Sequence, residues 1–261
     1  MINLYRSLIF FCASIALAVP HSVAGEDDAV AYYSERAVEW LSDAISRETV
    51  KGRGLVPAYA ESLEQVFLEA GFPREALTIV PYGETASLVV RYEGDGSSGR
   101  KPILFSSHMD VVPADPNSWL RHPFEFQEDE TFYYGRGVLD NKFDVTMLTT
   151  LFVWLKESGF VPNRDLVIAF TGDEETAQET VQQLAGDYRD LVDAEYALVV
   201  DGGGGVDSPG GVGILSSVKN AISSCCLADC TQELGLLSWR HLVIASVLIL
   251  LCFIELSSVA V

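Results

Sequence analysis

The sequence predicts an α/β fold, in which a mostly parallel sheet carries helices on both of its faces. Short apolar segments of strand length alternate along the chain with longer segments of helical periodicity, which is the pattern of repeated βα units. Several of the strand segments are apolar throughout, as expected for strands that are covered on both faces. The sequence contains no internal repeat and no low-complexity linker, so the α/β pattern is continuous.

Four helices are predicted from apolar residues that recur every three to four positions. The first covers residues 27–47. The second covers residues 59–71 and is ended by Gly71 and Pro73. The third, residues 141–158, is apolar around nearly its whole circumference, so we expect it to be buried. The fourth runs through residues 179–188.

Strands are predicted in short apolar segments bounded by turn residues. Residues 77–82, 87–93 and 103–108 contain three of them, and the turn-rich sequence GDGSSGRKP precedes the third. Residues 165–175 and 195–205 contain two further segments, which we expect to be buried strands with acidic ends, the second followed by a glycine loop. The sequence FEFQEDETFYYG predicts a hairpin.

The charge and the cysteine content narrow the classes of function. The chain has 261 residues and a net charge of −20, all of which residues 25–211 carry. So acidic a protein is a poor partner for nucleic acid or for an anionic membrane, and the composition favours a solvated acidic surface. Residues 25–224 contain no cysteine, which excludes a disulfide framework or a thiolate metal site there. A metal bound in this region would have oxygen and imidazole ligands.

Residues 1–24 have the features of a secretory signal peptide. Arg6 precedes the apolar run SLIFFCASIALAV, and Ser22-Val23-Ala24 has the small residues of a cleavage site. The run is short for a complete membrane span, so cleavage is favoured over an anchor that is never cut. We therefore expect a secreted, periplasmic or otherwise extracytoplasmic protein that begins at Gly25.

Six acidic or imidazole side chains lie at the ends of predicted strands or at the start of the buried helix. They are His108, Asp110, Asp140, Glu174, Glu175 and Asp201. In open α/β sheets, ligands bind outside the carboxyl ends of the strands, so we expect these side chains to meet in one crevice. Each alone has an ordinary explanation as a surface residue, helix cap, first-turn acid or turn residue, but the set as a whole does not.

Such a set suits a pair of divalent metal ions. Zinc accepts imidazole and carboxylate ligands, and two metals roughly 3.5–4 Å apart can activate a water molecule and polarise a carbonyl group. In an extended chain His108 and Asp110 share a face, the arrangement of an imidazole ligand and its orienting carboxylate. Of the adjacent Glu174 and Glu175, one can bind metal while the other acts as general base.

Four segments resemble the motifs of the M20 family of metallopeptidases and aminoacylases, in the order in which that family carries them. They are SSHMDVVPAD, YYGRGVLDNK, FTGDEET and LVVDGGGG. The resemblance covers roughly residues 30–211, and it implies a zinc-exopeptidase-like catalytic domain. The segment NSWLRHPFEF is also similar to the family, and we expect His122 within it to be structural.

The resemblance implies a role for each candidate residue. His108, Asp140 and Asp201 would bind one metal, and Asp140 would bridge to a second metal held also by Glu175. Asp110 would orient the imidazole, and Glu174 would be the general base. The resemblance implies two zinc ions, although Co²⁺ or Mn²⁺ also suit these ligands, and substrates that are peptides or N-acyl amino acids.

Residues 212–261 depart from the family pattern and end in an apolar run over residues 242–261. Three interpretations stay open. The segment is a product of read-through, frameshift or an alternative transcript end; or a transmembrane anchor, against which the acidic Glu255 counts; or a GPI-type signal. The abrupt change in cysteine and charge content favours the first.

The resemblance also implies a lid domain and a distant histidine that completes the second metal site. Residues 212–261 lack both patterns, and we do not expect His241 to be that ligand. We therefore predict a truncated catalytic domain of a metal-dependent amide hydrolase. The alternative is a catalytically inactive fragment, tethered to a membrane by its tail, that keeps a partial metal site. The sequence does not indicate which oligomeric state the protein has.

Overall fold

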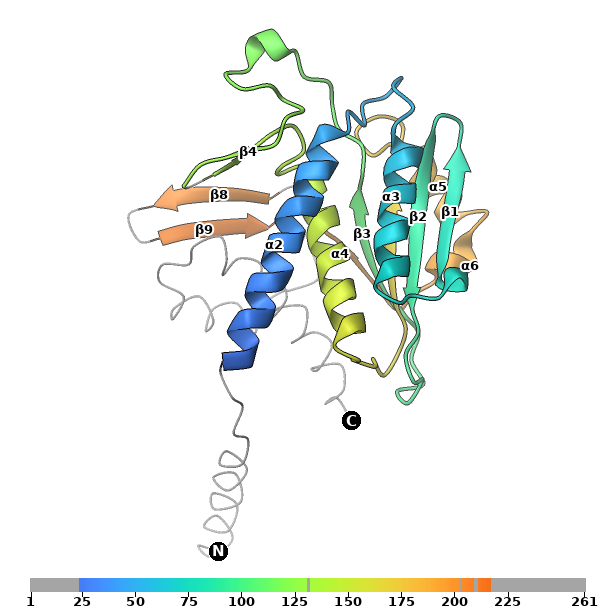
Figure 1. The fold of residues 1–261 in the computed structure, drawn as a ribbon. Helices are drawn as coiled ribbons and strands as arrows, with labels where there is room; N and C mark the ends of the chain where they lie inside the picture. The colour runs from blue at the N-terminus through green and yellow to red at the C-terminus, as the bar shows by residue number, and fades with distance from the viewer. Residues whose placement is uncertain (1–23, 131, 202, 209–210, 217–261) are drawn as a thin grey trace, which may run out of the picture.

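A computed structural model describes residues 24–130, 132–201, 203–208 and 211–216 (Figure 1). The expected signal peptide up to residue 23, the apolar tail and His241 lie outside these residues. Among the helices formed by the described part of the chain, none combines the length and the hydropathy that a membrane crossing requires.

A five-stranded mixed sheet forms the centre of the fold, in the strand order β1-β2-β6-β3-β7. The strands are β1 (Leu77–Tyr82), β2 (Thr85–Tyr92), β3 (Ile103–His108), β6 (Leu166–Thr171) and β7 (Tyr196–Val199). Strand β2 runs antiparallel to β1 and β6, whereas β3 runs parallel to β6 and β7. Four of the five strands therefore point the same way, which confirms the predicted mostly parallel sheet.

Helices cover both faces of this sheet, as predicted (Figure 1). One layer contains α2 (Ala24–Ser46), α3 (Val56–Glu69) and α4 (Lys142–Glu157), and the other contains α5 (Glu179–Ala185) and α6 (Arg189–Val192). Alternate residues of a strand point to opposite faces, and β2 follows this rule. Leu88 and Val90 pack against the first layer, and Val89 packs against the second.

Helix α4 is the buried helix expected from its nearly continuous apolar surface. Its buried side chains include Val145, Leu148, Leu151 and Phe152. The ring of Phe152 meets that of Phe105 on β3 edge to face, with 5.9 Å between the ring centroids. Burying a side chain of this size contributes about 1.5–3 kcal/mol. This packing holds α4 against the strand that carries His108.

The smaller elements lie outside the central sheet. The predicted hairpin is confirmed as β4 (Gln127–Glu128) paired with β5 (Tyr133–Tyr134), and single 3₁₀ turns cover Arg74–Ala76 and Pro116–Ser118. The expected glycine loop after Asp201 is wrong in part. Its residues form β8 (Gly203–Ser208), which pairs antiparallel with β9 (Gly211–Ser216). Glycine tolerates extended as well as turn geometry. Pairing with β9 therefore decides that these glycines form a strand and not a loop.

Strand β7 corrects another expectation, because it is not a buried strand. Tyr196 and Val199 are 53% and 56% exposed. Within the described residues β7 pairs with β3 on one side and forms the edge of the sheet. A short apolar run has the same sequence pattern at an edge as in a sheet centre, because the pattern reports residue type and not neighbours.

The strand order brings the candidate residues to one end of the sheet. His108 is the last residue of β3 and lies opposite Thr171, the last residue of β6. On the other side of β3, Ser106 pairs with Val199 near the end of β7. Parallel strands end at the same edge of a sheet, so the segments that follow β3, β6 and β7 all leave from this edge.

Candidate metal centre

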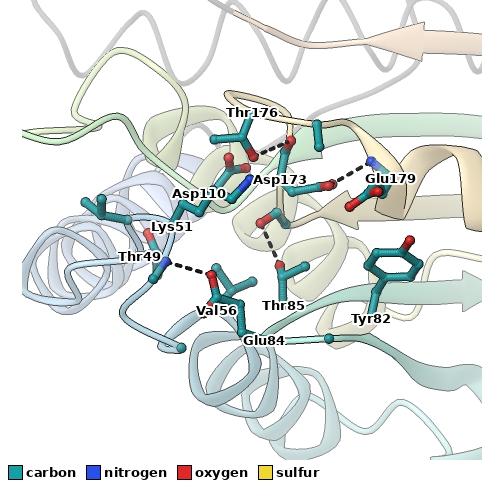
Figure 2. A pocket seen from close by; sticks show the side chains of 16 residues that line it. Thr49, Lys51, Val56, Tyr82, Glu84, Thr85, Asp110, Asp173, Thr176 and Glu179 are labelled. Atoms are coloured by element: carbon teal, nitrogen blue, oxygen red, sulfur yellow. Dashed lines mark hydrogen bonds between the residues drawn. The ribbon is translucent and has the colours of Figure 1, made fainter.

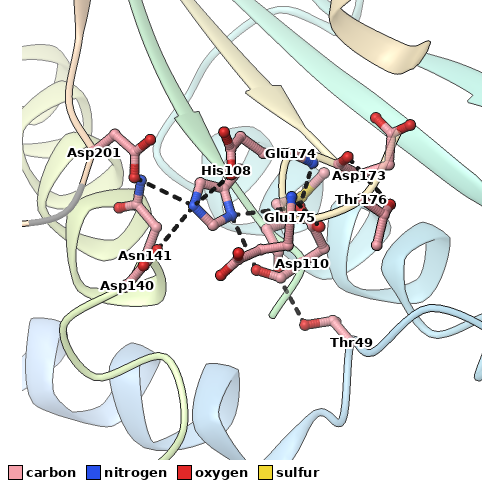
Figure 3. A network of polar contacts seen from close by, with 12 residues as sticks. Thr49, His108, Asp110, Asp140, Asn141, Asp173, Glu174, Glu175, Thr176 and Asp201 are labelled. Carbon is pink, nitrogen blue, oxygen red and sulfur yellow. Dashed lines mark hydrogen bonds and ion pairs between the residues drawn. The ribbon is translucent and has the colours of Figure 1, made fainter. Parts of the chain in front are cut away.

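Three of the predicted ligands converge on one point (Figure 3). His108 is 1% exposed, and its Nε2 lies 3.0 Å from Asp140 Oδ1 and 3.4 Å from Asp201 Oδ1. One potential ligand atom from each of the three side chains lies within 4.8 Å of the others. They come from the end of β3, the turn before α4 and the residues after β7. Sequence positions far apart thus supply one imidazole and two carboxylates to a common site.

The electrostatic environment of His108 favours a cation. Burial lowers the pKa of this imidazole, but the hydrogen bond and charge of Asp110 and the charges of Asp201 and Asp140 outweigh burial and raise it to about 9. Without a metal the imidazole therefore holds a proton at neutral pH. A divalent cation in the same place would satisfy the same carboxylates with a larger charge.

Asp110 determines which imidazole nitrogen faces the cluster. His108 Nδ1 lies 3.0 Å from the backbone oxygen of Asp110 and 3.4 Å from its Oδ1. A carbonyl oxygen can only accept, so Nδ1 carries the hydrogen and Nε2 is left to bind a metal. The carboxylate itself accepts the backbone N–H groups of Glu174 at 3.0 Å and Glu175 at 3.1 Å. Asp110 therefore links β3 to the turn after β6.

Glu174 and Glu175 lie on this turn, at the edge of the cluster. Glu174 Oε2 lies 3.9 Å from His108 Nε2, and its Oε1 accepts a hydrogen bond of 3.0 Å from Gln178. Burial is the largest cause that raises the pKa of both glutamates; for Glu175 the charge of Asp140 comes next. Glu175 is outside the group of three converging ligands, so its role as a metal ligand stays a prediction.

Two buried residues next to Asp140 were not among the predicted site residues, and one of them, Asn141, contacts the cluster directly. Asn141 is buried, and its amide nitrogen donates to Val200 O at 2.9 Å and to Asp201 Oδ1 at 3.2 Å. Lys142 is buried too, and its Nζ donates to Ala44 O at 2.6 Å at the end of α2. Burial lowers the pKa of Lys142 to about 7. They are the two residues that follow Asp140 in the segment YYGRGVLDNK, and this position was the available signal.

Asp144 is a further carboxyl close to the cluster. It lies in the first turn of α4, and burial, followed by the charge of Asp201, raises its pKa to about 7. The charge of Asp140 acts in the same direction, and that of His108 opposes it. The influence of these three charges on its pKa shows that Asp144 lies near the cluster. His122 is not part of the cluster; its Nδ1 accepts the backbone N–H of Phe124 at 3.3 Å, a structural contact as expected.

An imidazole and two carboxylates that converge outside the carboxyl ends of sheet strands form a group that could hold a metal ion. A family model described as Peptidase family M20/M25/M40 matches residues 104–234. The matched segment is just over half of the 261-residue chain. The chain belongs to this family, whose members are hydrolases.

Curated relatives match a shorter stretch. The N-fatty-acyl-amino acid synthase/hydrolase PM20D1.1 of Danio rerio is 39% identical over 79 residues, which cover 30% of this chain and 15% of that protein. Acetylornithine deacetylase of Dictyostelium discoideum is 40% identical over 79 residues, covering 29% of this chain and 18% of that protein. The chain thus spans less than one fifth of either relative.

Solved structures share the fold. The di-peptidase Dug1p of Saccharomyces cerevisiae aligns with a TM-score of 0.56 and 23% identity, over 70% of this chain and 42% of that one. The M20 family metallo-carboxypeptidase Sso-CP2 of Sulfolobus solfataricus aligns with a TM-score of 0.57 and 18% identity, over 67% of this chain and 39% of that one. At these identities the similarity shows a shared fold and nothing further.

The side chains present fit the metal that the family implies. One imidazole and two carboxylates are hard or borderline donors, the kind that zinc and similar divalent ions accept. Their ligand atoms already lie within 4.8 Å of one another, and the remaining nitrogen of His108 is held by Asp110. His108, Asp140 and Asp201 are therefore the residues of the described chain that would hold a metal.

Proposed function

We propose that the protein is a metal-dependent hydrolase of amide bonds in peptides or N-acyl amino acids. The observation that carries the proposal is the convergence of His108, Asp140 and Asp201, with the carboxylate of Glu174 3.9 Å from His108 Nε2. Membership of a hydrolase family supports it. The relatives named as a synthase/hydrolase of N-fatty-acyl amino acids and as a deacetylase support the substrate class.

The proposed mechanism divides the work among residues of this chain. His108, Asp140 and Asp201 would bind the metal, and Asp110 would keep the imidazole in the correct tautomer. When bound, a zinc ion supplies a Lewis acid for the substrate carbonyl and lowers the pKa of water. Gln178 occupies Oε1 of Glu174, so Oε2, which faces His108, takes the proton of the attacking water and passes it to the leaving nitrogen.

We extend the proposal to a second ion, which Asp140 and Glu175 would hold. The charge of Asp140 raises the pKa of Glu175, so the two carboxylates are close enough to interact. A cation shared between them would relieve this repulsion. Within the described residues one group of three ligands converges, so the second ion would take a further ligand from elsewhere.

Zinc content and amidase activity together test the proposal. The full chain loaded with zinc should hydrolyse N-acyl amino acids or dipeptides. Glu174→Gln should lower kcat by roughly 10²–10⁴-fold, the usual contribution of a general base, without loss of bound zinc. Glu61→Gln, at an exposed position on α3, is the matched control and should leave both unchanged. Zinc binding without turnover would instead support the catalytically inactive fragment with a partial site, and the absence of zinc binding would refute both.

We also propose that the chain is exported, on the basis of Arg6, the apolar run that follows it and the small residues before Gly25. Expression of the full chain in its own host, followed by fractionation and N-terminal sequencing, tests this. A mature protein that begins at Gly25 supports cleavage. A cytoplasmic protein that retains Arg6 contradicts export.

A further inference from the structure

Lys142, the first residue of α4, is a fully buried lysine without a carboxylate in direct contact. It is 0% exposed, and within the described part of the chain its Nζ contacts backbone oxygens and an aromatic ring but forms no ion pair. The carboxylates of Asp43 and Asp110 act on its charge only from a longer distance. Burying an amine in this way costs free energy, so its presence needs a reason beyond packing.

The amine of Lys142 binds the end of α2. Its Nζ donates to Ala44 O at 2.6 Å and to Arg47 O, and it lies 5.7 Å from the centre of the Tyr59 ring. Each of the two oxygens has a second donor, because Ala44 O accepts the N–H of Arg47 at 3.2 Å and Arg47 O accepts that of Thr49 at 2.8 Å. The end of α2 therefore does not depend on the lysine to satisfy these oxygens.

The loop before α4 packs directly against the end of α2. A Cβ atom at Gly135, where φ is +154°, would lie 2.6 Å from Ile45 Cγ2. A Cβ atom at Gly137, where φ is +90°, would lie 3.0 Å from Cδ of Lys142. One glycine thus leaves room for a side chain of α2, and the other leaves room for the stem of the lysine. Both glycines and the lysine belong to the segment YYGRGVLDNK.

This arrangement determines where Asp140 lies. The backbone N–H of Lys142 donates to Gly137 O at 2.9 Å, so residues 137–142 form a closed loop that contains Asp140. The side chain of Asp140 is 49% exposed, and its Oδ1 lies 3.0 Å from His108 Nε2. Because so exposed a side chain has few packing contacts of its own, its place in the cluster depends on how firmly the loop is held.

We propose that Lys142 is a positioning residue for the candidate metal centre. By fixing loop 137–142 to the end of α2, it holds Asp140 where this carboxylate meets His108 and Asp201. The inference deepens the proposed function and rests on the metal site assigned there. Lys142 itself touches neither metal nor substrate. Charged or neutral, its amine carries at least two hydrogens, one for each of the two backbone oxygens.

Matched lysine replacements in the full chain test this role. Methionine has a similar unbranched stem and no N–H group. Lys142→Met should weaken zinc binding roughly 10–100-fold in a chelator competition, the usual effect of losing a group that orients a metal ligand. Lys156→Met is the control on the same helix; its Nζ lies 5.3 Å from the ring centres of Phe72 and Tyr92, and its zinc affinity should stay within about twofold of the wild type. Equal affinities of the two variants would overturn the proposal.

Two readouts show whether Lys142 acts through Asp140. In a chain that already carries Asp140→Asn, Lys142→Met should lower the zinc affinity by less than about threefold, because the ligand that it positions is gone. The visible spectrum of bound Co²⁺, which also suits these ligands, should change in Lys142→Met and stay the same in Lys156→Met. A full loss of affinity in both backgrounds, or an unchanged spectrum, would show that the lysine serves the fold and not the ligand.

A pair of glycine variants decides the question if Lys142→Met does not fold. Gly137→Ala would crowd the stem of Lys142 and should weaken zinc binding by roughly tenfold. Gly159→Ala introduces the same methyl group at a φ of +73°, with no atom within 4 Å of it, so it carries the backbone strain alone and should keep the affinity of the wild type. Equal zinc affinities of these two variants would overturn the proposal.

Zinc affinity also separates failure of this inference from failure of the proposed function, because it is measured without a substrate. A wild type that binds zinc and hydrolyses no amide contradicts the proposed hydrolase, and the comparison of the lysine variants still decides the role of Lys142. A wild type that is active, together with equal zinc affinities of the lysine variants, overturns the positioning role alone. A wild type that binds no zinc overturns both.

Discussion

Replacing Asp144 with asparagine should stabilise the metal-free protein above neutral pH. Asp144 is half-buried at the start of α4, and desolvation, followed by the charges of Asp201 and Asp140, raises its pKa from 3.8 to about 7. At about 1.36 kcal/mol per pKa unit, this change costs the ionised carboxyl roughly 4 kcal/mol in the folded state. Asparagine has nearly the same shape and no charge, so the variant should recover up to about this amount at pH 8.

The two pKa values of this carboxyl determine how the stability of the wild type changes with pH. The carboxyl ionises near its ordinary pKa of 3.8 in the unfolded chain and near pH 7 in the folded one. The stability of the wild type is therefore full below the first value and falls as the pH rises through the second. Urea unfolding in the presence of a chelator, at intervals from pH 5 to pH 8, should show a widening gap between variant and wild type. Asp187→Asn, at an exposed position on the surface, should shift stability by no more than about 0.5 kcal/mol. A variant that is no more stable than the wild type at pH 8 would refute the reasoning.

Three further predictions concern the metal and the core. Asp110→Asn should weaken zinc binding roughly 10–100-fold in a chelator competition. The two backbone N–H groups bind different oxygens of Asp110, and the amide nitrogen that replaces one of them cannot accept. Unchanged affinity would contradict the orienting role. Zinc affinity should rise with pH up to about 9, since the imidazole of His108 must lose its proton first. Calorimetry in buffers of different ionisation enthalpy should detect the released proton, and a pH-independent affinity would argue against His108 as a ligand. Phe152→Ala should lower the free energy of unfolding by about 3–5 kcal/mol; a loss under about 1 kcal/mol would show that α4 is loosely packed.

The elements with strong local signals were predictable from the sequence. Strands β1 and β3 begin and end where the apolar runs place them. Gly83 follows the first and Pro102 precedes the second. The burial of α4 followed from its composition, since a helix that is apolar all round needs cover on every side. Strand β7 shows where this reasoning ends. Its apolar residues are visible in the sequence, but its position at the edge of the sheet is not. Only the strand order shows that position.

The candidate site was predictable to the extent that it obeys a rule of topology. Parallel strands place their carboxyl ends together, so the approach of His108 and Asp201 follows from strand positions. Asp140 joins them from the turn before α4. Asp144 was missed because a first-turn acid is common in helices, and its burial depends on neighbours. A cavity of about 210 Å³ behind Asp110 was not predictable either (Figure 2). It exists because a loop, a turn and the end of a strand meet across the fold, with a glycine at residue 172 where the backbones approach.

The hydrogen bonds that Asp110 accepts from the backbone of Glu174 and Glu175 have a consequence for how this centre tolerates change. One side chain fixes the histidine on β3 and, at the same time, the turn that carries the proposed base. Neither can be repositioned alone, so alterations on the two strands should reinforce or rescue each other instead of adding. Selection or design that aims at a new substrate would have to keep these two hydrogen bonds of Asp110. We expect variation to be tolerated at the exposed residues of the turn, such as Thr176 and Ala177.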